Sequence, residues 1–116
     1  MANTFKIKTN DAMPTSAGTP LTLYTVPGST TTVVLGLMLC NFHTSQVLVD
    51  VHIESDTSDT ETNSNVHAIK DAPIPAGSTL EVMAGNKVVL EATDEIKIDC
   101  SVADKLSGTL SIMEIT

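Results

Sequence analysis

Short apolar segments separated by turn residues recur along the whole chain. They are rich in Val, Ile and Thr, and most alternate between apolar and polar positions, which is the period of a β-strand with one buried face. The clearest example is the segment 47–54, in which Val47, Val49, Val51 and Ile53 alternate with Leu48, Asp50, His52 and Glu54. No window has a convincing helical period, so the pattern predicts an all-β protein.

The pattern predicts eight or nine short strands. They are expected near residues 4–9, 21–26, 31–42, 47–54, 66–71, 79–84, 87–91, 95–102 and 109–115. Spacings near ten residues with turns between them are typical of an antiparallel β-sandwich or a jelly roll. A chain of 116 residues has room for one modest core. We therefore expect one sandwich domain over residues 21–116, preceded by an N-terminal strand and a flexible arm over residues 1–20.

Two segments in the second half carry specific expectations about pairing. Gly85-Asn86 is a two-residue turn of the type favoured in tight hairpins, so the strands at 79–84 and 87–91 are expected to pair with each other. The segment 72–77 contains two prolines, which are expected to prevent regular pairing there.

The segment 31–42 is apolar on both faces. Such a strand is either central in the sandwich or covered on its second face by a partner. Under the second interpretation, candidate oligomer or assembly contacts are Leu35, Leu37 and Leu39 from this strand and Phe5 and Ile7 from the first strand.

Composition limits the partners. Charged residues make up 17% of the chain, against about 25% in a typical protein. The shortfall is filled by Thr, Ser and Asn. This composition suits a surface that lies against neighbouring proteins, but it is also typical of β structure in general. The net charge is −8 and all six basic residues are Lys. Because Arg, which grips phosphates and base edges, does not occur, we expect no nucleic-acid partner.

No membrane partner is expected either. The acidic excess argues against binding to anionic membranes. The longest apolar stretch, residues 33–42, is shorter than the roughly 20 residues that a membrane-spanning helix needs. Residues 1–10 lack the apolar region of a signal peptide, so we expect synthesis in a cytoplasm.

Groups that could carry metal or cofactor chemistry are scattered. His52 has Asp50 and Glu54 as neighbours on one outward face, and these three groups could hold a divalent cation loosely. Such a face is more often merely solvated. The acidic loop 56–61 has neither the central Gly of an EF-hand nor a Glu at the last position of the twelve-residue loop. We therefore expect no metal and no cofactor.

No catalytic arrangement is visible. The chain has no Gly-x-Ser-x-Gly elbow and no Gly-rich phosphate loop, and Asp94, Glu95 and Asp99 are candidates by abundance only. Three aromatic residues are too few for a stacking platform. Cys100 is expected to be a buried free thiol, with a disulfide to Cys40 as the alternative. We expect no enzymatic activity.

Several segments share a pattern with a known family. They are residues 1–6 (Met-Ala-Asn-Thr-Phe-Lys), 23–27 (Leu-Tyr-Thr-Val-Pro), 47–51, 72–80 (Ala-Pro-Ile-Pro-Ala-Gly-Ser-Thr-Leu), 87–92 and 111–115. In these segments the chain resembles small virion structural proteins of tailed bacteriophages, especially phages of marine bacteria and cyanobacteria. The relatives tend to have Gly-Asp where this chain has Thr93-Asp94. A turn that needs a positive φ suits Thr poorly, so a different turn is expected there.

The resemblance implies a non-enzymatic virion protein that is assembled in the host cytoplasm. We expect a capsid decoration or cement protein, a homo-oligomer and in particular a trimer, that binds the major capsid protein or other virion proteins and stabilises the shell through its binding free energy. The N-terminal segment would be an arm that adds a strand to a neighbour's sheet. The alternatives are a tail, neck or fibre-associated part of the same particle and, from another class, a small jelly-roll ligand-binding module or enzyme.

Overall fold

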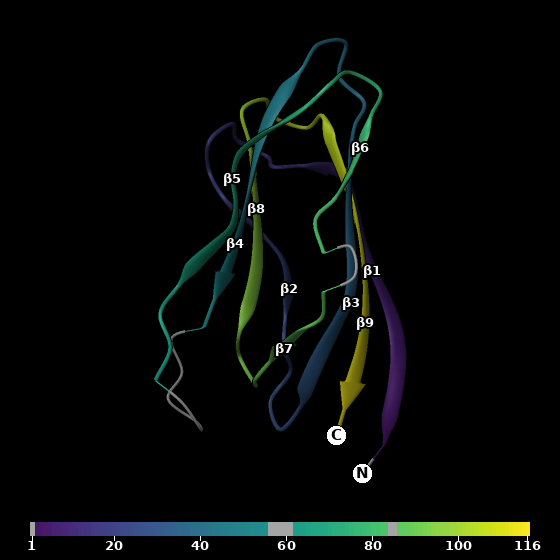
Figure 1. Ribbon diagram of the computed structural model, residues 1–116, viewed down its shortest axis with the longest axis vertical. Helices are drawn as coiled ribbons and strands as arrows, with labels where there is room; N and C mark the ends of the chain where they lie inside the picture. The colour runs from purple at the N-terminus through teal and green to yellow at the C-terminus, as the bar shows by residue number, and fades with distance from the viewer. Residues whose placement is uncertain (1, 56–61, 84–85) are drawn as a thin grey trace.

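The computed structural model describes residues 2–55, 62–83 and 86–116, and these residues form nine strands in two antiparallel sheets (Figure 1). The strands are β1 (Asn3–Met13), β2 (Leu21–Thr25), β3 (Thr31–Asn41), β4 (Val47–Glu54), β5 (Val66–Ile74), β6 (Thr79–Glu81), β7 (Val88–Leu90), β8 (Glu95–Cys100) and β9 (Leu106–Ile115). The five-stranded sheet has the order β1-β9-β3-β6, with β7 also paired to β3, and the four-stranded sheet has the order β2-β8-β4-β5. The predicted all-β sandwich is confirmed. Within the described ranges, no helix is long and apolar enough to span a membrane.

The strand order is that of a jelly roll. β6 and β7 pair with two different parts of β3, at residues 38–40 and 32–34, so they share one position in the sheet. Nine strands with two in one position give eight positions. Counted along the chain, the sheets then have the orders 1-8-3-6 and 2-7-4-5, which is the jelly-roll arrangement of two Greek keys.

The pairing of β6 and β7 corrects the expected hairpin. Both strands pair with β3 and not with each other. The amide of Val82 also donates to the carbonyl of Leu37, at 2.8 Å, so contact with β3 continues past β6. An eleven-residue strand offers a long row of backbone groups that must find partners, and two short segments satisfy them in turn. Gly85 of the expected turn lies outside the described residues.

β5 corrects the expectation about the prolines. This strand continues to Ile74, and Pro73 lies opposite Leu48 of β4. β5 is an edge strand, and an edge strand tolerates Pro because one side of its backbone has no neighbour to bond. The sequence shows the proline but not the position of the strand in the sheet.

Residues 2–20 lie against the rest of the sandwich. β1 pairs along its length with β9, and Met13 at its end is fully buried in the core. The connection to β2 is held to the sandwich, because the amide of Gly18 donates to the carbonyl of Cys100 at 3.0 Å. Residues 3–13 are therefore a strand of the sandwich, and the connection after them contacts the sandwich at Gly18.

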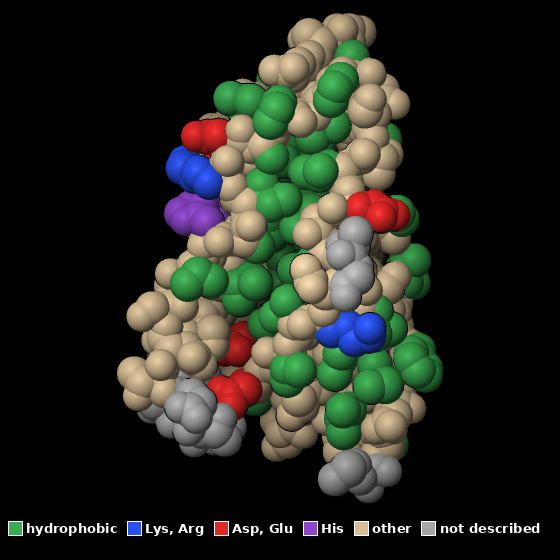
Figure 2. All heavy atoms as spheres, in the orientation of Figure 1, with side chains coloured by type: hydrophobic (Ala, Val, Ile, Leu, Met, Phe, Trp, Pro, Cys, Tyr) green, Lys and Arg blue, Asp and Glu red, His purple; other side chains and the backbone are tan. Residues whose placement is uncertain are grey.

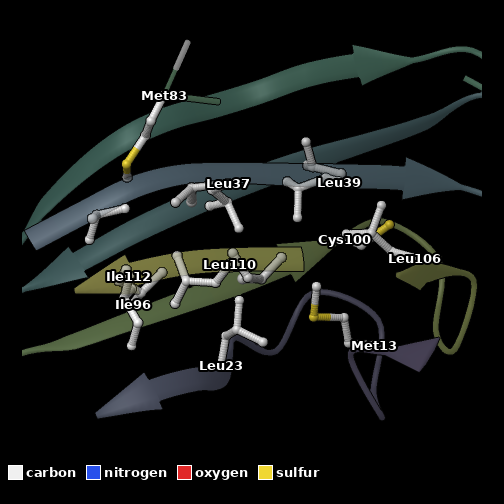
Figure 3. Packing of buried hydrophobic residues seen from close by; sticks show 14 of the residues in the cluster. Met13, Leu23, Leu37, Leu39, Met83, Ile96, Cys100, Leu106, Leu110 and Ile112 are labelled. Carbon is white, nitrogen blue, oxygen red and sulfur yellow. The ribbon is translucent and has the colours of Figure 1, made fainter. Parts of the chain in front are cut away.

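The core lies between the two sheets. Hydrophobic side chains fill the band between them (Figure 2), and in the close view those of the two sheets point toward one another (Figure 3). The largest fully buried side chains are Met13, Leu37, Leu39, Ile74, Leu90, Ile96, Ile98, Leu106, Leu110, Ile112, Val26 and Val34. Full burial of such a side chain stabilises the fold by about 1.5–3 kcal/mol relative to exposure. Cys100 is buried and both cysteines are free, which confirms the expectation of free thiols.

Buried polar side chains link the sheets at both ends of β3. At its C-terminal end, the amide nitrogen of Asn41 donates to the carbonyls of Ile74, at 2.8 Å, and Ser45, at 3.0 Å. At its N-terminal end, the hydroxyl of Tyr24 on β2 donates to the carboxylate of Glu114 on β9 at 2.6 Å. These bonds satisfy groups that would otherwise be costly to bury.

The turn before β8 differs from the expectation for Thr93. Thr93 has a φ of 72°, so it adopts the positive φ that was expected to be avoided. This conformation costs a non-glycine residue roughly 1–2 kcal/mol. The surrounding bonds offset the cost: the amide of Thr93 donates to Val26 at 3.0 Å, and the buried carboxylate of Asp94 accepts from the amide of Glu91 at 2.9 Å.

Candidate functional site

The five candidate contact residues separate into two groups. Phe5 and Ile7 on β1 are 72% and 69% exposed, and Leu35 is half-buried on β3. Leu37 and Leu39 are buried in the core and cannot reach a partner, so the expectation for these two side chains is corrected. The reason is strand alternation after a register shift between Val34 and Gly36, which sends Leu37 and Leu39 inward.

Four apolar side chains form a row across the outer face of the five-stranded sheet. Phe5 lies opposite Met113, Met113 opposite Val33, and Val33 opposite Val89. Directly opposed side chains on neighbouring strands have Cβ atoms about 4.5–5.5 Å apart, so the row is continuous. Phe5 and Val89 at its ends are 72% and 63% exposed. We call Phe5, Met113, Val33 and Val89 the apolar row.

Flanking residues show that the apolar row faces outward. Met113 lies between buried Ile112 and Glu114, and Val33 lies between buried Thr32 and Val34. Since successive side chains of a strand point to opposite faces, the row must face away from the core. Figure 2 shows hydrophobic side chains gathered along the margin of the molecule formed by this sheet.

A shallow hollow adjoins the apolar row. It has a volume of about 280 Å³ and lies where β3 bulges, with Leu35, Met38 and Glu81 among its lining residues. A Cβ atom added at Gly36 would meet open space, which shows that the bulge is not covered by another part of the described chain. Met38 is 42% exposed. Ile7 on β1 lies opposite Ser111, which together with Thr109 adds polar groups to the lining, so the hollow is apolar only in part.

The outer face of the four-stranded sheet has the opposite character. Three opposed pairs lie on it: Asp50 with Asp99, His52 with Lys97, and Glu54 with Glu95. We call these six residues the charged face. Lys97 lies 3.3 Å from Glu54, and the hydroxyl of Thr22 donates to Glu95 at 3.0 Å. Acidic, basic and histidine side chains are visible along this side of the molecule in Figure 2.

The possible cation-binding group of the sequence is rearranged in the structure. Glu54 is paired with Lys97, and Asp99 of β8 stands in its place: Asp50, His52 and Asp99 bring one ligand atom each within 4.8 Å of one another. Sequence reasoning missed Asp99 as a member because only the register of β4 with β8 places it opposite Asp50. His43 lies elsewhere, with its amide bonded to Asn41.

The remaining candidates do not converge on one place. Asp94 is buried in a turn, where it accepts from Ser55 at 3.0 Å, and Glu95 belongs to the charged face. Burial raises the pKa of the Cys100 thiol, which keeps it protonated and a poor nucleophile. The acidic loop 56–61 lies outside the described residues.

Glu114, which is buried, is the central residue of an ionic group that includes the half-exposed side chain of Lys6. Its carboxylate lies 2.8 Å from the ammonium of Lys6 and accepts from Tyr24, whose hydroxyl also bonds to Thr32 at 2.8 Å. The bond to Lys6, with that from Tyr24, holds the pKa of Glu114 below its ordinary value. Burial, with the bond to Glu114, raises the pKa of Tyr24 to about 12. At neutral pH Glu114 is therefore ionised and Tyr24 is neutral. Their bonds join β1, β2 and β9.

Comparisons with known proteins give no further guide. No protein-family model, no curated protein and no solved structure matches this chain.

Proposed function

We propose that this chain is a non-enzymatic structural subunit of a virus particle, and specifically a decoration protein that binds the assembled capsid of a tailed bacteriophage. The observation that carries the proposal is the apolar row on the outer face of the five-stranded sheet. The largest apolar patch on a protein surface is often functional, and apolar patches are typical of surfaces that a partner covers.

The size of the face suits a contact repeated in many copies. At about 3.3 Å per residue, β1 extends over about 35 Å, and four neighbouring strand positions at about 4.8 Å spacing span about 14 Å. The whole outer face of this sheet, of which the apolar row is one part, is therefore about 500 Å², smaller than the roughly 800 Å² that each partner contributes to a standard interface. A modest contact of this kind gains strength when several linked copies bind one lattice, which favours the expected trimer.

The contact is proposed to use the face of the sheet and not an exchanged strand. The first strand already pairs with β9 of its own chain and supplies Met13 to the core, so releasing it would expose core surface. Lys6 is held on Glu114, which further secures β1 in place. The proposal therefore differs from the expectation that the N-terminal segment adds a strand to a neighbour's sheet.

Two further observations support the viral assignment. The segment 72–80, which carries the strongest resemblance to virion proteins, forms the end of β5, the turn and the start of β6. The jelly roll is used by viral capsid domains, although lectins and cupins share it. Since a fold does not establish a function, the surface carries the argument and the architecture agrees with it.

Copy number in purified particles tests the proposal. Quantitative mass spectrometry would measure this chain against the major shell protein of the particles. Hundreds of copies are expected for a decoration protein. A dozen or fewer would place the chain at the neck, tail or fibres and overturn the decoration role, and absence from the particles would overturn the virion role altogether.

A further inference from the structure

Two carboxylates oppose each other directly on the charged face. Asp50 of β4 pairs in register with Asp99 of β8. Like charges directly opposite one another destabilise a sheet unless something compensates them. His52 lies two residues along β4 on the same face, and one ligand atom from each of the three side chains lies within 4.8 Å of the others.

Two atoms of this group are buried without a partner. The Nε2 atom of His52 and the Oδ1 atom of Asp99 have no hydrogen-bond partner among the described residues. A buried polar atom left unsatisfied costs about 1–3 kcal/mol. A cation bound between them would satisfy both atoms at once and would remove the repulsion between the aspartates.

The surroundings leave negative charge for a cation to neutralise. Lys70 is 3.8 Å from Asp50 and 3.6 Å from Asp71, and its side chain is largely exposed, so it compensates these carboxylates only in part. Lys97, which lies opposite His52, is paired with Glu54.

The neighbouring groups also orient the ligands and leave room beside them. One oxygen of Asp50 accepts from the amide of Asp71, which fixes the carboxylate. Asp50, Asp71 and Asp99 line a hollow of about 150 Å³, which has space for water molecules on an ion.

We propose that Asp50, His52 and Asp99 form a binding site for a divalent transition-metal ion, with Zn²⁺ as the probe ion. Imidazole nitrogen together with carboxylate oxygen suits Zn²⁺ and its neighbours, whereas Mg²⁺ and Ca²⁺ prefer oxygen alone. Ligand atoms at about 2.1 Å from Zn²⁺ lie about 3.4 Å apart, so small side-chain rotations close the site. The ring of His67 on β5 lies 4.4 Å from that of His52.

This proposal departs from the expectation of no metal, which considered Asp50, His52 and Glu54 along one strand. The ion would join β4 to β8 in the middle of the four-stranded sheet. Its role would be to stabilise the sandwich, independently of whether the chain belongs to a virus particle.

The test uses the full chain without a histidine tag, stripped of metal by a chelator. Calorimetric titration with Zn²⁺ is expected to give one ion per chain, and saturating Zn²⁺ is expected to raise the Tm by about 5–10 °C. The variants His52→Gln and Asp99→Asn should lose the shift. Glu54→Gln, a substitution on the same face but outside the cluster, should retain it, and Mg²⁺ should give no comparable shift.

A second measurement on the unaltered chain guards against variants that do not fold. Co²⁺ is expected to give a visible d–d absorption band with one equivalent and no thiolate charge-transfer band. No Zn²⁺-dependent shift, an equal shift in His52→Gln, or a thiolate band from Cys40 would each overturn the site. None of these readouts involves virus particles, so the result does not depend on the proposed function.

Discussion

The two sheets bury similar inner faces but present opposite chemistry to the outside. The outer face of the four-stranded sheet carries Asp, Glu, Lys and His, whereas the five-stranded sheet carries the apolar row. A charged face is stable in water without a partner. Covering an apolar face is favourable by roughly 25 cal/mol for each Å² of apolar surface that is removed from water. The inner faces therefore hold the fold together, and the outer face of the five-stranded sheet is the one that we propose for recognition.

Neighbouring residues of β3 lie on the inner and the outer face of the same sheet. Leu39 faces the core and is fully buried, while its neighbour Met38 faces outward and is 42% exposed. We expect Leu39→Ala to lower the free energy of unfolding by about 2–5 kcal/mol, because it leaves a cavity between the sheets. Met38→Ala should cost less than about 1 kcal/mol. Urea denaturation measures the free energy of unfolding of both variants, provided that their m-values are equal. Equal losses would mean that the assignment of the two faces is wrong.

The ionic group around Glu114 should give the next largest effect, because it places a carboxylate on the inner side of the sandwich. Glu114→Gln is expected to cost about 1.5–3 kcal/mol at pH 7, since it leaves Tyr24 and Lys6 without an ionised acceptor. Chemical denaturation of the variant and the unaltered chain at the same ionic strength measures the loss. A loss below about 0.5 kcal/mol would show that the carboxylate contributes little to the fold.

The same group predicts the pH dependence of stability. The pKa of Glu114 is lowered in the fold, so its contribution is present above the ordinary glutamate pKa and is lost as the pH falls through the folded-state value. The pKa of Tyr24 is raised to about 12, so its contribution is present below pH 10 and is lost as the pH rises from 10 toward 12. Denaturation midpoints across pH should fall at both limits. Glu114→Gln should flatten the acid side and Tyr24→Phe the alkaline side; unchanged curves in these variants would contradict the assignment.

The sequence predicts those features of the fold that depend on one strand at a time. The alternation of residues 47–54 fixes which side chains of β4 face the core, and the observed strand has the same bounds. It does not specify what depends on pairing between distant strands. The meeting of Asp50 with Asp99 and the alignment of Phe5 with Met113 follow from register, which is set by the whole sandwich.

Two failed expectations have a related cause. Leu37 and Leu39 were grouped with Leu35 because all three lie two residues apart in the sequence, yet a bulge separates their faces. Pro73 was expected to interrupt pairing, yet its strand lies at an edge. In both cases local residue type is compatible with more than one arrangement, and tertiary context selects among them.

The apolar row should show a large effect on association with a small effect on folding. Phe5→Ser and Val89→Ser alter side chains that are 72% and 63% exposed, so we expect stability to change by no more than about 0.5 kcal/mol. Binding of these variants to phage capsids that lack this chain should weaken at least tenfold, as measured by co-sedimentation. Leu48→Ser provides the matched control, because Leu48 is an exposed apolar residue on the opposite sheet. An equal loss in the control would remove the distinction between the faces.

The smallest effect is expected on the charged face, at the pair formed by Lys97 and Glu54. Their side chains are 27% and 31% exposed and 3.3 Å apart, and partly exposed pairs of this kind contribute about 0.2–1 kcal/mol. A double-mutant cycle with Lys97→Met and Glu54→Gln, measured by chemical denaturation without added metal, isolates the coupling energy between them. The coupling should shrink as salt is added, because screening acts on exposed charges. A coupling well above 1 kcal/mol that is insensitive to salt would mean that the charged face also stabilises the fold. The two outer faces would then differ in their contribution to stability as well as in their surface chemistry.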